Sequence, residues 1–180
     1  MALSTAVLHP QRVRTVTGLT TMPWRKIDVA RYVRFGMFAK MASNVRSVGT
    51  DEQAVDTLVE IVRMLSAPGQ PFDEEWARQV ARISHARSPR DVGTTQRHFA
   101  AGRASEELTG RIGEIRVPTL LINGADDPVV RPKAAAALAA RIPGARAEIH
   151  PQMGHAVQEH LWPRLVEAVA THAGSGTPVR

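Results

Sequence analysis

The chain has 180 residues, of which 43% are hydrophobic and 22% are charged, and this composition is typical of one ordinary globular domain. It contains no cysteine, which excludes disulfide frameworks, thiolate zinc sites and cysteine nucleophiles. The net charge is +6, but all except three of the 23 basic residues are Arg and these are scattered singly along the chain, so the charge does not indicate a nucleic-acid partner.

The first 21 residues predict a helix followed by a strand, which we interpret as the beginning of an α/β core. Residues 1–8 are good helix formers and stop just before Pro10, a residue that the interior of a helix does not tolerate. Residues 12–20 then form a β-rich segment that is broken at Pro23. A helix, a tight turn and a strand in this order are typical of an α/β domain.

The region from residue 22 to residue 115 carries only helical patterns, and we interpret it as a helical insert. Its clearest signal is Thr50-Asp51-Glu52-Gln53, which fits a reciprocal capping box at the start of a helix. A second signal is the acidic group that begins at Asp73, because acidic residues stabilise the first turn of a helix. The helices expected in this region are residues 27–41, a helix that starts at residue 50, residues 73–85, residues 95–101 and residues 105–112.

Residues 116–173 predict a return to alternating strands and helices. Residues 117–123 are a nearly continuous apolar run, the pattern of a parallel strand that is covered on both faces. The other elements expected here are a helix over residues 132–142, a strand over 147–150, a helix over 163–172 and a flexible tail over 174–180. With the opening segment, the sequence predicts an α/β fold of about three parallel strands with flanking helices.

Polar side chains follow two successive strands of this last region. Asp127 lies in Gly124-Ala-Asp-Asp-Pro after the first strand, and His155 follows Met153-Gly154 after the second. Catalytic groups of parallel sheets gather at the carboxyl ends of the strands, and neighbouring strands lie about 4.8 Å apart. We therefore expect a hydrogen bond from His155 to Asp127 that orients the imidazole as a base for a hydroxyl nucleophile. Asp126 as the acid, a purely structural Asx turn, and a surface-loop role for His155 stay open as alternatives.

At these residues the chain resembles the α/β-hydrolase superfamily, whose carboxy-terminal signature is a strand, Gly-x-x-Asp, a helix, a strand and Gly-His. Gly124 to Asp127 and Gly154-His155 match this signature. Residues 1–13 resemble the helix after the family's nucleophile elbow and the strand that follows it, and the helical insert resembles the family's cap domain. At residues 66–73 and from residue 117 onward the chain is most similar to the aclacinomycin methylesterase-like group, whose members hydrolyse carboxylic esters.

The resemblance implies a serine-type ester hydrolase in which Asp127 orients His155, because the family's carboxylate stands three residues after the Gly. It also implies a Ser nucleophile in a Gly-x-Ser-x-Gly elbow just before the first helix. No Gly-x-Ser-x-Gly occurs in the 180 residues. We therefore expect the carboxy-terminal part of a truncated hydrolase, which lacks the amino-terminal half with the nucleophile and is inactive alone.

Aromatic side chains of the helical insert are candidates for the substrate pocket of such a hydrolase. The four candidates are Trp24, Phe35, Phe38 and Trp76. Their helical spacing gives them an alternative role as packing residues of the cap. We expect two or three of the apolar side chains in this region to face a small-molecule ester.

The sequence predicts neither a cofactor nor a metal site, because His150 and His155 have no carboxylate or third histidine at ligand spacing. No apolar run approaches the roughly 20 residues of a membrane-spanning helix, so we expect no membrane partner and a cytoplasmic location. Two other functions stay open. The chain could be a binding or assembly module that self-associates, or binds a partner chain, through the exposed edge of the strand at residues 12–20. It could also perform non-hydrolytic chemistry with Asp and His alone.

Overall fold

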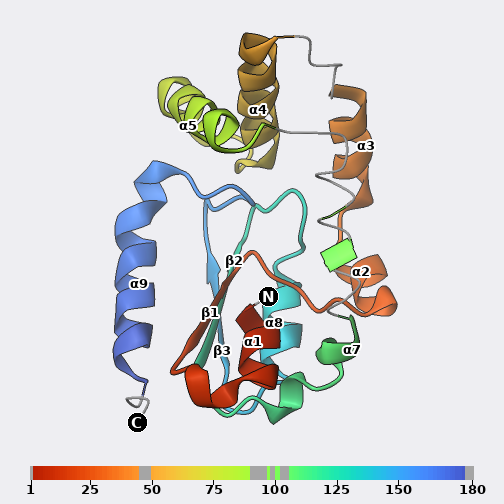
Figure 1. Cartoon of the computed structure of the whole chain (residues 1–180), viewed down its shortest axis with the longest axis vertical. Helices are drawn as coiled ribbons and strands as arrows, with labels where there is room; N and C mark the ends of the chain where they lie inside the picture. The colour runs from red at the N-terminus through yellow and green to blue at the C-terminus, as the bar shows by residue number, and fades with distance from the viewer. Residues whose placement is uncertain (1, 45–49, 90–96, 98–99, 102–105, 177–180) are drawn as a thin grey trace.

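The protein is built around a small parallel sheet, and the computed structural model describes residues 2–44, 50–89, 97, 100–101 and 106–176. The strands lie in the order β1-β2-β3 and all run in the same direction (Figure 1). Their bounds are Val16–Leu19 for β1, Thr119–Gly124 for β2 and Arg146–His150 for β3. All six residues of β2 are buried, as expected for the apolar central strand. The predicted α/β fold with three parallel strands is confirmed.

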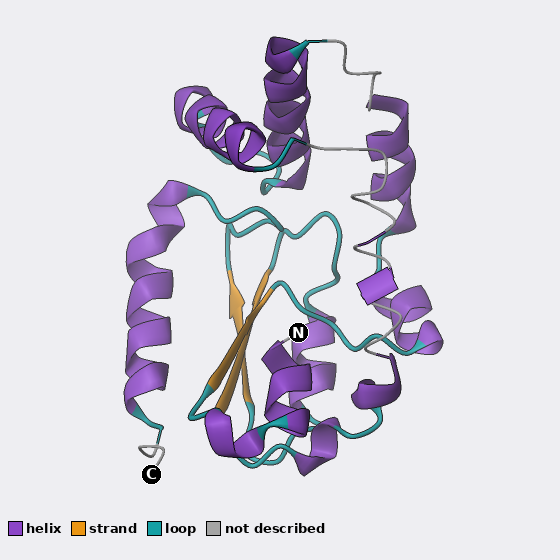
Figure 2. Ribbon diagram, viewed as in Figure 1, coloured by secondary structure: helices purple, strands orange, loops and turns teal. Residues whose placement is uncertain are grey.

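Side chains of β2 alternate between the two faces of the sheet, and each face has its own helices. Leu121 lies in one cluster with residues of α1 (Ala2–Leu8) and α8 (Lys133–Ala139). Leu120 and Ile122 pack instead against α9 (Trp162–Gly174). The result is three layers, with α1 and α8 on one side of the sheet and α9 on the other (Figure 2). Burial of each of these large β2 side chains contributes about 2 kcal/mol.

The carboxyl ends of the strands meet at one edge of the sheet. In the last residue pairs of the ladders, Leu19 lies opposite Ile122 and Gly124 lies opposite His150. Buried Asn123 fastens the chain just after β1, because its side-chain oxygen accepts from the Thr21 amide at 3.1 Å and its NH₂ group donates to the Thr21 carbonyl at 3.2 Å. Because Gly124 and His150 lie opposite each other, the loops that leave β2 and β3 start side by side.

Between β1 and β2 the described part of the chain is helical. Its α-helices are α2 (Lys26–Tyr32), α3 (Phe35–Asn44), α4 (Asp51–Leu65), α5 (Glu74–Arg87) and α7 (Glu106–Thr109). Figure 1 shows α4 and α5 side by side, beyond the carboxyl ends of the strands. They pack through a small apolar cluster of Val55, Val59, Ala77 and Ala81, and we call this pair the α4–α5 hairpin. The boundaries of a cap at residues 22 and 115 stay a prediction.

Both helices of the hairpin begin where the sequence predicts them. The Gln53 amide donates to Thr50 Oγ1 at 3.2 Å and the Thr50 amide donates to Gln53 Oε1 at 3.3 Å, so the capping box at the start of α4 is complete. Asp73 caps α5 by accepting from the Trp76 amide at 2.8 Å. These local hydrogen bonds satisfy amide groups that a helix start otherwise leaves without partners.

The expected single helix over residues 27–41 is wrong, because the chain leaves the helical conformation at Val33 and starts again as α3. Val33 is buried and forms an isolated antiparallel bridge with Val130. The Arg34 amide donates to the Val129 carbonyl, and the Arg131 amide donates to the Tyr32 carbonyl, both at 2.8 Å. These bonds to a distant loop hold Val33 in an extended conformation and override the local helical preference.

Several ends of elements also differ from the prediction. β1 begins at Val16 rather than residue 12, because Pro10–Arg12 form a short 3-10 helix. The helix expected over residues 105–112 is α7 followed by a 3-10 turn, Ile112–Glu114. The helix expected over residues 95–101 and the end of the expected tail fall mostly outside the described residues. No described helix is long and apolar enough to cross a membrane.

Candidate active site

The loops after β2 and β3 hold each other through backbone groups. The Ala125 amide donates to the His150 carbonyl at 2.9 Å, and the Asp126 amide donates to the Met153 carbonyl at 3.2 Å. Gln152 adopts a left-handed conformation with φ of 62°, and its amide donates to the Asp126 carboxylate at 3.1 Å. Asp126 therefore fixes the path of the second loop.

Asp127 is the better-held of the two neighbouring carboxylates. Its side chain is fully buried, and Oδ1 accepts from the amides of Val129 and Val130 at 2.7 Å and 2.8 Å. The other oxygen, Oδ2, lies 2.9 Å from Nδ1 of His155. Three N–H donors thus compensate for the removal of this carboxylate from water. The Asx turn that the sequence left open as an alternative is present, and it coexists with the contact to His155.

His155 completes the contact that the sequence predicts. Because a carboxylate oxygen accepts a hydrogen bond, Nδ1 is the ring nitrogen that donates to Asp127, which leaves Nε2 as the other ring nitrogen. Within the described part of the chain Nε2 has no hydrogen-bond partner, and 29% of the side chain is exposed. A buried acid behind an imidazole with one open nitrogen is the arrangement that a general base requires.

Two glycines allow the loops of this site to come together. A Cβ atom on Gly124 would overlap the carbonyl group of Met153, and a Cβ atom on Gly154 would overlap the backbone of Ser66 and Ala67. Only glycine fits such a close approach of two backbones. Gly124 and Gly154 are thus required by the geometry that brings Asp127 and His155 into contact.

The four aromatic candidates lie in different parts of the structure. Trp24 packs against a cluster around Val33 and Val130, and it lines a small pocket of about 90 Å³ between α1, the end of β1 and α7. Trp76 joins the apolar cluster of the α4–α5 hairpin. Phe35 is exposed, and the Phe38 side chain lies outside what the structure describes. Trp24 and Trp76 therefore belong to different apolar clusters, and the substrate-binding role of all four stays a prediction.

Sequence reasoning missed the backbone groups that hold the site. The amides of Val129 and Val130 follow Asp127 directly, and the Asp-Asp-Pro turn signal could have indicated them. The Leu65 carbonyl accepts from the amides of His155 and Ala156 at 2.8 Å and 2.9 Å. No local sequence signal indicates that contact, because Leu65 is about 90 residues away along the chain.

Histidines and carboxylates do not gather into a metal site in the described part of the chain. No group of three or more such side chains that could hold an ion occurs there. His150 turns toward Glu148, with 3.2 Å between Nε2 and Oε2, while His155 turns toward Asp127. His150 and His155 thus have different carboxylate partners.

Comparison with known proteins decides the family. The family model of the alpha/beta hydrolase fold matches residues 1–160. The chain belongs to the α/β-hydrolase fold family. The predicted superfamily is confirmed.

The curated relatives of this α/β-hydrolase chain include two methylesterases. It is 31% identical over 134 residues to rhodomycin D methylesterase DauP from Streptomyces sp. (strain C5), which covers 72% of this chain and 43% of DauP. It is also 31% identical over 133 residues to rhodomycin D methylesterase DnrP from Streptomyces peucetius, which covers 71% of this chain and 43% of DnrP. The matched part is thus less than half of each relative.

Solved structures share the fold of this α/β-hydrolase chain. A meta-cleavage product hydrolase from Pseudomonas fluorescens IP01 superposes with a TM-score of 0.62 and 18% identity, over 96% of this chain and 60% of that chain. A hydrolase from Pseudomonas aeruginosa PA01 gives a TM-score of 0.59 at 22% identity, over 97% and 60%. Nearly the whole chain therefore corresponds to about three fifths of a hydrolase of this fold.

Proposed function

We propose that the chain carries the acid and the base of a carboxylic-ester hydrolase, with His155 as the base and Asp127 as its orienting carboxylate. The observation that carries the proposal is the 2.9 Å contact between Nδ1 of His155 and Oδ2 of Asp127, with Nε2 open. Membership of the α/β-hydrolase fold family and the two methylesterase relatives support the reaction class.

The roles of the two residues follow from the tautomer. Nε2 of His155 takes the proton of a hydroxyl nucleophile as its oxygen attacks the ester carbonyl carbon, and Asp127 stabilises the imidazolium that forms. The same Nε2–H then donates its proton to the departing alcohol, which leaves an acyl-enzyme. His155 next takes a proton from water as the water oxygen attacks the acyl carbon. It then passes that proton to the oxygen of the nucleophile as the bond from this oxygen to the acyl carbon breaks, which releases the acid.

The nucleophile of this proposal is a Ser that lies outside the 180 residues. No Gly-x-Ser-x-Gly occurs in them. A triad without its nucleophile retains little catalysis, so we expect the chain alone to hydrolyse esters at close to the background rate. Both relatives are named rhodomycin D methylesterases, and we propose a methyl ester of a small-molecule carboxylic acid as the substrate class.

The test supplies the missing part of the fold. The 180-residue chain is co-expressed with the part of DauP that it does not match, and hydrolysis of p-nitrophenyl acetate and of methyl esters is measured with and without that part. We expect turnover only in the mixture, its loss in His155→Ala, and its retention in His160→Ala, which changes an exposed histidine. Rapid hydrolysis by the chain alone that depends on His155 would show that the nucleophile lies within the chain.

A second candidate function is assembly through the edge of β1. In the described part of the chain β1 pairs only with β2, and Leu19 is 43% exposed. The amides of Val16 and Thr20 face β2, so by alternation those of Thr17 and Leu19 face the open edge. Open edges of this kind pair with other chains. Size-exclusion chromatography tests this function: we expect a dimer that Thr17→Pro converts to a monomer, whereas a wild-type monomer contradicts it.

A further inference from the structure

The segment that carries His155 lies against the α4–α5 hairpin at three places. The Leu65 carbonyl, at the end of α4, accepts from the amides of His155 and Ala156 at 2.8 Å and 2.9 Å. The buried Gln158 side chain donates from Nε2 to the Pro71 carbonyl at 2.8 Å. Further along, the rings of Trp76 and Trp162 meet edge to face, with centroids 5.9 Å apart. The hairpin therefore follows this segment from His155 to the start of α9.

These contacts determine where the imidazole lies. Two amide hydrogen bonds at residues 155 and 156 fix the backbone from which the ring projects, and Gly154 lies directly against the backbone of Ser66 and Ala67. Asp127 cannot follow a displacement of the ring, because its own carboxylate is buried and bound to two amides. A backbone shift of about 1 Å would stretch the contact between His155 and Asp127 beyond hydrogen-bond length.

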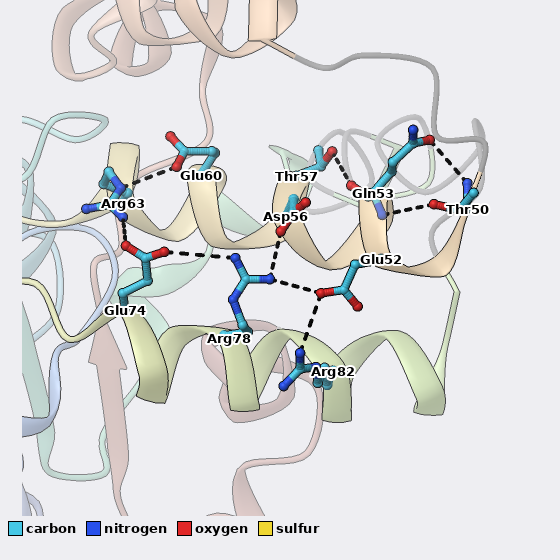
Figure 3. A network of polar contacts seen from close by, with 10 residues as sticks. All are labelled: Thr50, Glu52, Gln53, Asp56, Thr57, Glu60, Arg63, Glu74, Arg78 and Arg82. Carbon is cyan, nitrogen blue, oxygen red and sulfur yellow. Dashed lines mark hydrogen bonds and ion pairs between the residues drawn. The ribbon is translucent and has the colours of Figure 1, made fainter.

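The hairpin is braced so that α4 and α5 move together. Arg78 of α5 reaches Asp56 and Glu52 of α4 at 2.7 Å and 3.2 Å, and Arg63 of α4 reaches Glu74 of α5 at 2.7 Å (Figure 3). Each exposed ion pair of this kind contributes little to stability by itself. Together with the apolar cluster between α4 and α5, however, the ion pairs hold the two helices against each other. The position of the Leu65 carbonyl is thus tied to the whole hairpin.

We propose that the α4–α5 hairpin is the positioning element of His155, and that it acts through the Leu65 carbonyl and the close packing of Gly154. The proposal rests on the proposed function for its catalytic meaning, since His155 matters as the base. In structural terms, it states that displacement of the hairpin weakens the hydrogen bond between His155 and Asp127 while the sheet stays folded.

The experiment is nuclear magnetic resonance of the 180-residue chain with ¹⁵N-labelled histidine. The ring shifts report the tautomer of His155, and the downfield Nδ1 proton reports its bond to Asp127. In Gly154→Ala the added methyl group collides with the backbone at Ser66 and Ala67, so we expect loss of the downfield proton and a mixture of tautomers. The matched control is Gly36→Ala in α3, where a Cβ atom meets nothing within 4 Å, and both signals should stay.

If Gly154→Ala does not fold, a second variant tests the proposal. Gln158→Met keeps the volume of the side chain but removes the donor to Pro71, so we expect several-fold faster solvent exchange of the Nδ1 proton. A folded Gly154→Ala with unchanged signals, or an unchanged exchange rate in Gln158→Met, would overturn the proposal. Absence of esterase activity in the complemented protein would contradict the proposed function and leave these signals unaffected, so the two failures are distinguishable.

Discussion

The two halves of the candidate site are held in different ways. The Asp127 carboxylate is fully buried, and its Oδ1 is bound by amides two and three residues further along the chain. His155 is partly exposed, and its backbone is bound by the Leu65 carbonyl of a distant helix. Asp127 is thus fixed by its own loop, whereas the backbone of His155 is held by the hairpin. The difference implies that damage to the hairpin disturbs His155 before it disturbs Asp127.

The largest expected effect concerns Asp127, which its own loop holds. Asp127→Ala leaves two amides and the His155 ring without their acceptor in a buried site, so we expect a loss of about 3 kcal/mol in the free energy of unfolding. Urea denaturation measures it. The control, Asp126→Ala, removes one hydrogen bond to the Gln152 amide and should cost about 1 kcal/mol. Equal losses in the two variants would contradict the special burial of Asp127.

A buried carboxylate that is held by a distant residue provides an intermediate case. Asp28 receives two hydrogen bonds from Arg141, at 2.7 Å and 2.8 Å, across 113 positions of sequence. The hydrogen bonds from Arg141 hold the pKa of Asp28 below its ordinary value, although burial acts in the opposite direction. At neutral pH we expect Asp28→Asn to lower the free energy of unfolding by about 1 to 2 kcal/mol.

The pH dependence of this variant has a definite sign. Because the folded pKa is lowered, the stabilisation by ionised Asp28 is present above the unfolded pKa of about 3.9 and is lost as the pH falls through the folded value. The difference in free energy of unfolding between wild type and Asp28→Asn should therefore become smaller in acid. Urea unfolding at several pH values would measure it. Glu114→Gln, in an exposed pair with Arg111, is the control and should show little change. A difference in free energy of unfolding that becomes larger in acid would contradict the lowered pKa of Asp28.

The smallest expected effect tests the comparison directly. Arg78→Ala removes the ion pairs with Asp56 and Glu52 across the hairpin. We expect several-fold faster hydrogen exchange of the His155 and Ala156 amides, which the hairpin holds.

The locally held amides serve as the internal reference for that measurement. Exchange of the Val129 and Val130 amides, which bind Asp127, should stay unchanged in Arg78→Ala. Arg111→Ala, which breaks an exposed pair outside the hairpin, should change neither set. Equal acceleration of both sets in Arg78→Ala would mean that the two halves of the site are held in the same way.

Much of the site could be predicted because its signals are short. Gly124 to Asp127 and Gly154-His155 stand at the ends of two successive strands, and the parallel sheet brings those ends together. The choice between Asp126 and Asp127 came from resemblance, and the structure shows its physical basis. Asp126 accepts from the Gln152 amide, whereas Asp127 faces the imidazole.

The wrong helix boundary, and the packing that the sequence did not reveal, concern contacts between distant segments. Residues 27–41 have a helical pattern throughout, yet the bridge between Val33 and Val130 divides them into two helices. Trp24 and Trp76 have the same apolar character in the sequence, yet they belong to different clusters. No window of local sequence contains these partners, so periodicity cannot reveal them.

The sequence alone determined the parallel core, the starts of the hairpin helices and the residues that meet at the strand ends. The helix starts depend on hydrogen bonds within a few residues, and the buried central strand depends on a short apolar run, so a local pattern records both. Only the tertiary structure decided that Val33 interrupts a helix and that the Leu65 carbonyl holds His155. Those contacts join residues that are 97 and 90 positions apart, and their formation depends on how the whole chain packs.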